Sequence, residues 1–176
     1  MALAASVLML GTTSSLQTTN EALRQTIAHG IAEQLIDEVV GTRYHSVGAD
    51  PYQITFTPSF YEQSGSGRER YDDVDDYDQV RAQPPEDPWG TELGQGDGEG
   101  GIRHPAFRAP AEFFDNWQEE IDVYYVDESD PTARLPFGQV SDYRAVEVRI
   151  FYDDPDGGRR ELVNLRRVVA YVPPLP

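Results

Sequence analysis

The sequence predicts an α+β fold in which one long N-terminal helix packs on a small antiparallel β-meander, with a long irregular loop between them. Residues 1–41 carry apolar side chains at helical spacing, and residues 113–176 contain segments of alternating apolar and polar residues. Residues 42–112 are irregular apart from one short alternating stretch. The chain has 176 residues, which suits one domain plus an extended helix. We therefore divide it into a helix, a loop region and the sheet of a head domain.

The first segment begins with an almost wholly apolar stretch, MALAASVLML, and then becomes polar without a break. Apolar side chains recur at spacings of four or seven, which places on one stripe of a helix Leu16, Leu23, Ile27, Ile31, Leu35 and Val39. Gly41 is expected to end the helix in the left-handed conformation. Because the apolar face of the sheet needs a cover, we expect residues 23–39 to provide it.

The apolar segment at residues 1–11 is too short to anchor a chain in a membrane, because a spanning helix needs about 20 apolar residues. A secretory signal peptide is the alternative, since its apolar core has about 7 to 15 residues. A signal peptide has basic residues before that core, however, whereas the first basic residue here is Arg24, and no small-x-small cleavage site stands out. We therefore interpret the segment as part of a membrane and assembly helix whose first residues precede Met1.

The region after the helix contains one strand candidate, at residues 52–57, where apolar and polar residues alternate. Residues 61–112 are expected to be irregular, with a Pro-rich stretch and the Gly-rich run GQGDGEGG. A connection of this length is unusual within a compact domain, so we expect this loop to be functional or partly mobile.

The C-terminal region contains three segments typical of strands, at residues 117–127, 143–152 and 159–172. The sequence DDPDGG between the last two has the Asp and Gly residues that a hairpin turn requires. In the middle segment apolar residues alternate with others, so one face of the sheet is expected to be buried. The predicted core combines helix and strand residues, namely Leu35, Val39, Ile121, Val123, Val148, Ile150 and Val168.

The composition excludes several classes of protein. The formal net charge of −17 argues against binding to nucleic acid, whose backbone attracts the opposite charge, and against docking on anionic lipid through a basic face. All 14 basic residues are arginines. Cysteine is absent, which excludes a disulfide framework and a thiolate metal site.

An acidic tract, YDDVDDYD at residues 71–78, brings together Asp72, Asp73, Asp75, Asp76 and Asp78. Crowded carboxylates repel one another unless a cation or N–H donors compensate them. Calcium is one alternative, because Ca²⁺ takes about six to eight oxygen ligands. An EF-hand loop counted from Asp73 has Tyr77 at its fifth position and lacks the required glycine. We interpret the aspartates as residues that cap turns, accept backbone N–H bonds and face water, and we assign no metal or other cofactor.

The sequence shows no pattern typical of a catalytic site. His29, His45 and His104 are far apart and do not have the spacing of metal ligands. Glu119 and Glu120 are adjacent in a predicted strand, so they point to opposite faces, and we place them at a strand edge. The Gly-rich run lacks the lysine and the following helix of a phosphate-binding loop. We therefore predict that the protein is not an enzyme.

Taken together, the helix that ends in AEQLIDEV, the tract YDDVDDYD and the terminal β-meander resemble the minor prepilins of type IV pili and type II secretion systems. The resemblance is greatest to the D subunit of mannose-sensitive-haemagglutinin pili and to PilV-like and pseudopilin I-like proteins. It covers residues 1–41 and 71–78, the sheet in outline, and hardly any of the Gly-rich loop. The leader and the cleavage motif, a Gly followed by Phe-Thr-Leu-x-Glu, are missing, so no residue is assigned to processing.

The resemblance implies a structural subunit of a type IV pilus or a type II secretion pseudopilus. Such a subunit is held in the inner membrane with its head in the periplasm and then joins a filament at the cell surface. Its partners would be other pilins or pseudopilins, and the expected assembly contacts are Leu3, Val7, Leu10, Leu16 and Leu23. The alternative is an exported β-rich module that binds a ligand through its acidic loop, with or without calcium.

Overall fold

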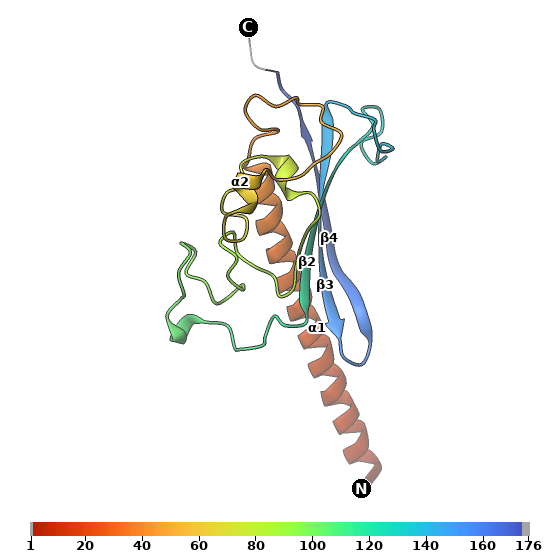
Figure 1. The fold of residues 1–176 in the computed structure, drawn as a ribbon. Helices are drawn as coiled ribbons and strands as arrows, with labels where there is room; N and C mark the ends of the chain where they lie inside the picture. The colour runs from red at the N-terminus through yellow and green to blue at the C-terminus, as the bar shows by residue number, and fades with distance from the viewer. Residues whose placement is uncertain (1, 174–176) are drawn as a thin grey trace.

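A computed structural model of the chain describes the backbone of residues 2–173 and the side chains of residues 18–173. The elements in chain order are α1 (Ala2–Val40), α2 (Phe60–Gln63), the 3₁₀ helix η1 (Val74–Tyr77), β1 (Val80–Ala82), the 3₁₀ helix η2 (Pro105–Phe107), β2 (Trp117–Tyr125), β3 (Tyr143–Asp154) and β4 (Gly158–Ala170). One long helix packs against a single four-stranded antiparallel sheet (Figure 1). The predicted α+β class is confirmed.

The sheet has the order β1-β2-β3-β4, and each strand is antiparallel to its neighbours. The three predicted strands are confirmed as β2, β3 and β4, and the predicted hairpin turn joins β3 to β4 at residues 155–157. The short strand β1 was not predicted. It lies within the stretch that we expected to be irregular and pairs with residues 119–121 of β2.

The helix α1 contacts β3, β4 and η1 through its C-terminal half. Ala28 and Ala32 are fully buried, and their small side chains let the helix approach the sheet closely. The larger side chains buried on the same stripe are Ile31, Leu35, Ile36 and Val39. Leu23 is 55% exposed, so the covering face begins at the partly buried Ile27 rather than at Leu23 as predicted.

Two polar contacts join the helix to the end of the sheet where the β3–β4 turn lies. The Arg24 guanidinium lies 4.2 Å from the centre of the Tyr152 ring and donates a hydrogen bond to its hydroxyl at 3.1 Å. Glu21, one turn earlier, forms an ion pair with Arg160 of β4. Beyond this point α1 runs past the β3–β4 turn and out of the head (Figure 1).

The predicted core is confirmed at six of its seven positions: Leu35, Val39, Ile121, Val123, Val148 and Ile150 are all buried. Val168 is the exception, with an exposed fraction of 39%. On β4 the residues that pack on the core are Val163, Leu165 and Val169. Since neighbouring strand residues point to opposite faces, Val168 faces away from the helix.

Two further predictions about the segment after α1 are wrong. Gly41 follows the end of the helix as predicted, but it does not have the positive φ of a left-handed residue; its N–H continues the helical pattern by donating to Asp37. Residues 52–57 form no strand. Of the apolar residues in this segment, Phe56 packs against the core with its ring 5.2 Å from the Tyr125 ring, whereas Tyr52 and Ile54 are 40% and 53% exposed.

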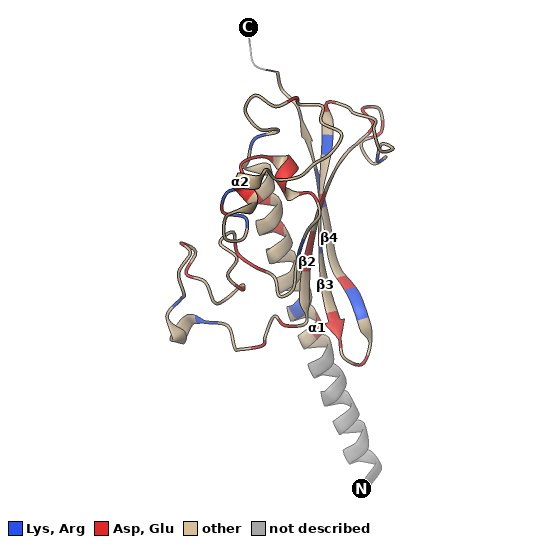
Figure 2. Ribbon diagram, viewed as in Figure 1, with Lys and Arg blue, Asp and Glu red and all other residues tan. Residues whose placement is uncertain are grey.

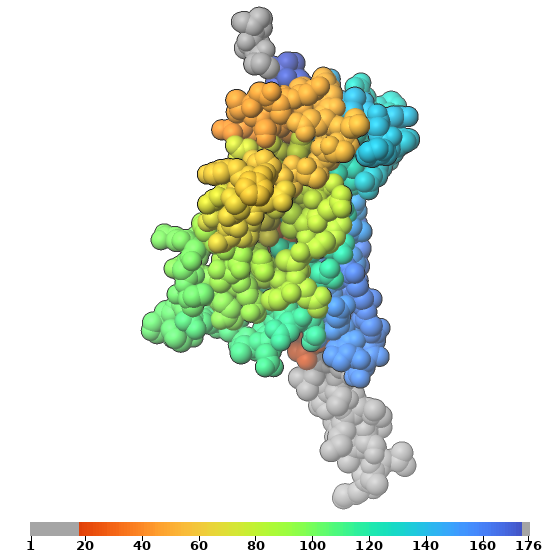
Figure 3. Space-filling model, in the orientation of Figure 1, coloured from red at the N-terminus to blue at the C-terminus, as the bar shows by residue number. Residues whose placement is uncertain are grey.

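Residues 42–112 cover the side of α1 that the sheet does not reach, as the orange to green surface in Figure 3 shows. The Gly-rich run within this segment forms a tight turn closed by a bridge between Gly96 and Ile102. Asp97 accepts backbone N–H bonds from Glu99 and Gly101 inside the turn, and these bonds lower the pKa of its carboxyl group. The run therefore has a local structural role.

Candidate functional site

The acidic tract folds into η1, which lies against the C-terminal end of α1 beside α2, where acidic residues gather in Figure 2. Asp73 is the N-cap of η1, and its Oδ1 accepts the N–H of Asp75 at 2.8 Å. Asp76 Oδ2 in turn accepts the N–H groups of Asp72 and Asp73, at 3.0 and 3.3 Å. The two carboxylates thus form a capping box, which satisfies backbone donors that the helix start leaves open.

Asp75 points the other way, into the head, where it forms an ion pair with Arg144 of β3. Arg144 is fully buried and also donates hydrogen bonds to the carbonyls of Tyr44 and Pro51, at 2.6 and 2.7 Å. Its guanidinium carbon lies 4.1 Å from the centre of the Tyr44 ring. A single arginine therefore ties η1 and the 44–51 segment to the sheet.

Asp78 closes the tract two residues before the start of β1. Gln79, between Asp78 and the strand, has a positive φ of 61°. The Asp78 carboxylate then takes the place of the next backbone carbonyl, because its Oδ1 accepts the Val123 N–H at 3.0 Å. Asp72 is exposed and pairs with Arg43 at 2.6 Å.

The structure thus confirms that Asp73 and Asp76 cap η1 and that Asp73, Asp76 and Asp78 accept backbone N–H bonds. Asp72 and Asp75 form ion pairs with arginines instead. The expectation that the aspartates face water is wrong for Asp73, Asp75 and Asp76, which are 2%, 5% and 2% exposed. The sequence showed the crowding of acidic residues, but it did not show that Asp75 is buried in an ion pair with Arg144 on a distant strand. The nearest signal was Arg144 itself, which stands within the apolar positions of the predicted strand.

Burial has a strong effect on two of these acids. It raises the pKa of Asp75 to about 7, although the Arg144 guanidinium opposes the shift. It also raises the pKa of Asp76 to about 7; the backbone bonds from Asp72 and Asp73 oppose this shift, and the negative charges of Asp73 and Glu62 add to it. Near neutral pH a proton therefore relieves part of the repulsion among these carboxylates.

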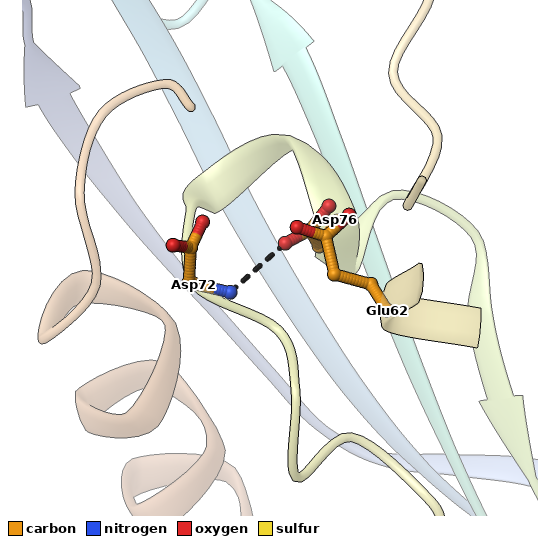
Figure 4. Close-up of side chains that lie close together, drawn as sticks. All are labelled: Glu62, Asp72 and Asp76. Carbon is orange, nitrogen blue, oxygen red and sulfur yellow. Dashed lines mark hydrogen bonds between the residues drawn. The ribbon is translucent and has the colours of Figure 1, made fainter. Parts of the chain in front are cut away.

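Glu62, Asp72 and Asp76 form the one group among the described residues whose His, Cys, Asp or Glu ligand atoms lie close enough to hold a metal ion, within 4.8 Å of one another (Figure 4). Glu62 belongs to a second capping box, in which its carboxylate accepts the Ser59 N–H at 2.5 Å. Two of the three carboxylates thus already accept backbone N–H bonds. The calcium candidates Asp73, Asp75 and Asp78 lie outside this group.

Calcium is expected to produce no saturable rise in melting temperature. A specific site would add about 2.7 kcal/mol to stability at a hundredfold excess of Ca²⁺ over its dissociation constant, which a thermal melt detects readily. Backbone N–H groups already compensate Glu62 and Asp76, and Asp76 also has a raised pKa, so the addition of Ca²⁺ should do no more than screen charge. A saturable increase that Asp76→Asn abolishes would establish a calcium site.

The raised pKa of Asp76 predicts that the protein is more stable to heat at about pH 5.5 than at about pH 8.5. An unfolded aspartate has a pKa of about 3.9, so the folded state binds the proton more tightly. The resulting stabilisation is fully present below the unfolded pKa and is lost as the pH rises through the folded value of about 7. Melts across this range measure the slope.

Asp76→Asn should flatten this pH dependence, while Asp75 and Glu119, whose pKa values are also raised to about 7, supply the slope that remains. Asp97→Asn is the matched control, because Asp97 is exposed and the pKa of its carboxyl group is lowered. If Asp76→Asn left the slope unchanged, the proton would not lie on Asp76.

A second buried charge cluster was not predicted. Arg68 donates to Glu119 of β2 at 2.8 Å and to Glu38 of α1 at 3.0 Å, and Glu119 is fully buried. Burial raises the pKa of Glu119 to about 7, and the Arg68 charge opposes that shift.

Glu120 lies on the other face of the sheet from Glu119, where it pairs with Arg149 at 3.1 Å. The opposite orientation of the two glutamates is confirmed, but β2 has strands on both sides, so they do not lie at a sheet edge.

The predicted assembly contacts fall mostly outside the described side chains. This applies to Leu3, Val7, Leu10 and Leu16, while Leu23 is described and is 55% exposed. Among the residues searched, no helix is both long and apolar enough to cross a membrane.

The three histidines lie on separate segments: His29 on α1, His45 in the loop that follows it, and His104 at the start of η2.

Comparisons with family models, with curated proteins and with solved structures give no match for this chain.

Proposed function

We propose that this chain is a minor pilin or pseudopilin, a structural subunit of a type IV pilus or a type II secretion pseudopilus. The observation that carries the proposal is the division of α1 into two parts. Its C-terminal half supplies the apolar cover of the sheet, and the helix continues past the head for several turns (Figure 1). Among the helix residues whose side chains the structure describes, those that pack in the head core begin at Ile27, and polar contacts of Glu21 and Arg24 with the sheet precede them.

The exposed Leu23 fits this proposal. It lies on the predicted apolar stripe, one turn before the covering face begins, and 55% of its surface is accessible. An apolar residue at this position can pack against the helix of a neighbouring subunit. The apolar segment at residues 1–11 continues in the same direction along the helix. Other pilins or pseudopilins are therefore the proposed partners, with the inner membrane as the location before assembly.

The alternative function, an exported module that binds a ligand through the acidic loop, is favoured by one observation. Glu62, Asp72 and Asp76 converge within 4.8 Å, and Asp72 is exposed to solvent. Calcium titration of the protein, described above, tests the calcium-dependent form of this alternative.

The proposal predicts that a charge within the apolar segment prevents assembly. Val7→Glu should remove the protein from filaments sheared off the surface of the native host, because a carboxylate among packed helices in lipid is costly, at about 2.5 to 3.5 kcal/mol. Immunodetection in the sheared fraction and in whole cells measures incorporation and abundance. The head should remain folded, since the helix side chains that the structure places in its core begin at Ile27, about five turns after Val7.

Val47→Glu is the matched control, because Val47 is 82% exposed in the head. It should enter filaments as the unchanged chain does. Normal incorporation of Val7→Glu would disprove the proposal, and so would the absence of the unchanged chain from every surface filament and pseudopilus preparation. The DNA upstream of Met1 offers an independent check: it should encode, in frame, a Gly followed by Phe-Thr-Leu-x-Glu.

A further inference from the structure

The chain contains an aspartate followed directly by a glycine at two places, Asp97–Gly98 and Asp156–Gly157. Such a pair can react with itself, because glycine has no Cβ to keep its backbone nitrogen away from the aspartate side chain. The first pair lies in the Gly-rich run, and the second lies in the turn between β3 and β4. Both aspartates are exposed, so exposure alone does not distinguish them.

The carboxylate of Asp97 is held in place by its own turn. Its Oδ1 accepts the N–H groups of Glu99 and Gly101, both at 2.9 Å, and the Asp97 N–H donates to the Gly101 carbonyl at 3.1 Å. A Cβ added at Gly101 would lie 2.3 Å from the Asp97 Oδ2, so the turn packs on that oxygen as well. The backbone bonds that lower the pKa of this carboxyl group keep it ionised, and they prevent it from turning toward the Gly98 nitrogen.

The carboxylate of Asp156 has no such restraint. The Asp156 N–H donates to Asp154 Oδ1 at 3.0 Å, but the Asp156 carboxylate accepts no hydrogen bond and forms no ion pair among the described residues. The Gly157 N–H donates to the Asp154 carbonyl at 3.2 Å, which is at the long end of the range for such bonds. A Cβ added at Gly157 would meet only Asp154, at 3.5 Å or more, so the space around this glycine is open. The Asp156 side chain is therefore free to rotate toward the Gly157 nitrogen.

We infer that Asp156 is a site of isoaspartate formation in the folded protein and that Asp97 is protected from the same reaction. The Gly157 nitrogen attacks the Asp156 Cγ, and the new C–N bond closes a five-membered succinimide ring. The hydroxyl of the protonated carboxyl group leaves as water with the proton of the Gly157 N–H. A second water molecule then opens the ring at the backbone carbonyl carbon, so that the chain continues through the side chain of Asp156. One water is lost and one is gained.

The reaction changes the turn that joins the two longest strands. Residues 155–157 are all exposed, and they connect Asp154 to Gly158, which are paired across the hairpin. Isoaspartate adds one atom to the backbone of this short connection, so the pair of Asp154 and Gly158 cannot keep its geometry. The turn lies beside the part of α1 that leaves the head (Figure 1). The modification therefore alters the head next to the projecting helix.

The test is prolonged incubation of the full chain at neutral pH and body temperature. Peptide mapping with electron-transfer fragmentation distinguishes isoaspartate from aspartate at each position. A parallel sample in guanidinium chloride gives the rate at each site in the unfolded chain. In the folded chain we expect Asp156 to react within about threefold of its unfolded rate and Asp97 to react at least about tenfold more slowly than its own, because the bonds of its turn must open first.

Gly157→Ala is the matched variant. Gly157 does not have a positive φ and an added Cβ makes only ordinary contacts, so the alanine fits the folded turn. The added methyl group hinders the attacking nitrogen and should slow the reaction at Asp156 at least about fivefold. Equal rates at Asp97 and Asp156 in the folded chain would overturn the inference, and so would an unchanged rate in Gly157→Ala. None of these outcomes depends on whether the protein enters a filament.

Discussion

Replacement of Arg144 by methionine is expected to lower the free energy of unfolding by about 3 to 5 kcal/mol. Arg144 is fully buried, and it is the partner of the buried Asp75 carboxylate. Methionine fills much of the same volume but donates no hydrogen bond, so Asp75 and the carbonyls of Tyr44 and Pro51 lose their donor. Urea unfolding followed by circular dichroism measures the loss.

Arg167→Met is the control for this experiment. Arg167 also lies in the sheet, but its ion pair with Asp37 has a separation of 3.8 Å and both side chains are more than half exposed. Its loss should cost no more than about 1 kcal/mol. Adding Asp75→Asn to Arg144→Met should recover part of the lost stability, because the acid is then removed together with its partner. Equal effects of the two arginine substitutions would contradict the role given to Arg144.

Leu35→Ala is expected to destabilise the head by about 2 to 5 kcal/mol. Leu35 is 3% exposed and lies on the face of α1 that covers the sheet, so its truncation leaves a cavity between the two layers. The head cannot readily close this cavity, because β3 and β4 are held in register along their lengths. Thermal and urea unfolding of the full chain both measure the effect.

Leu23→Ala supplies the comparison within the same helix. Leu23 is 55% exposed and lies before the covering face, so its truncation should change stability by no more than about 0.5 kcal/mol. The two substitutions have the same chemistry and nearly the same helix propensity cost, so the difference between them reports burial against the sheet. Similar losses for Leu35→Ala and Leu23→Ala would mean that α1 does not pack as described.

The helix and the three long strands could be predicted because each rests on a periodic pattern that many residues share. The stripe that includes Ile31, Leu35 and Val39 and the alternation of Val146, Val148 and Ile150 both report burial on one face. The prediction of Val168 failed because β4 carries adjacent valines at 168 and 169, and only the register decides which of them faces the helix. A pattern of alternate residues cannot distinguish two such neighbours.

The acidic tract could be located from the sequence, but its structure depends on contacts between distant segments. Asp75 meets Arg144 across 69 positions, and Glu119 meets Arg68 across 51. No local pattern encodes such a pairing. The strand β1 was missed for a related reason: it has three residues, and its pairing with β2 is what makes it a strand. The segment 52–57 shows the converse, since its residues alternate in polarity but have no neighbouring strand to pair with, and they form no strand.

The passage of α1 from the head core into the projecting turns has a mechanical consequence. A pull along the helix axis reaches the head through the same element that forms its core, without an intervening flexible linker. Because the buried stripe extends from Ala28 to Val39, such a force loads its contacts with the sheet in shear, all at once, rather than peeling them apart one by one. The force enters the head where two contacts join the helix to the sheet: the ion pair of Glu21 with Arg160 and the contact of Arg24 with Tyr152.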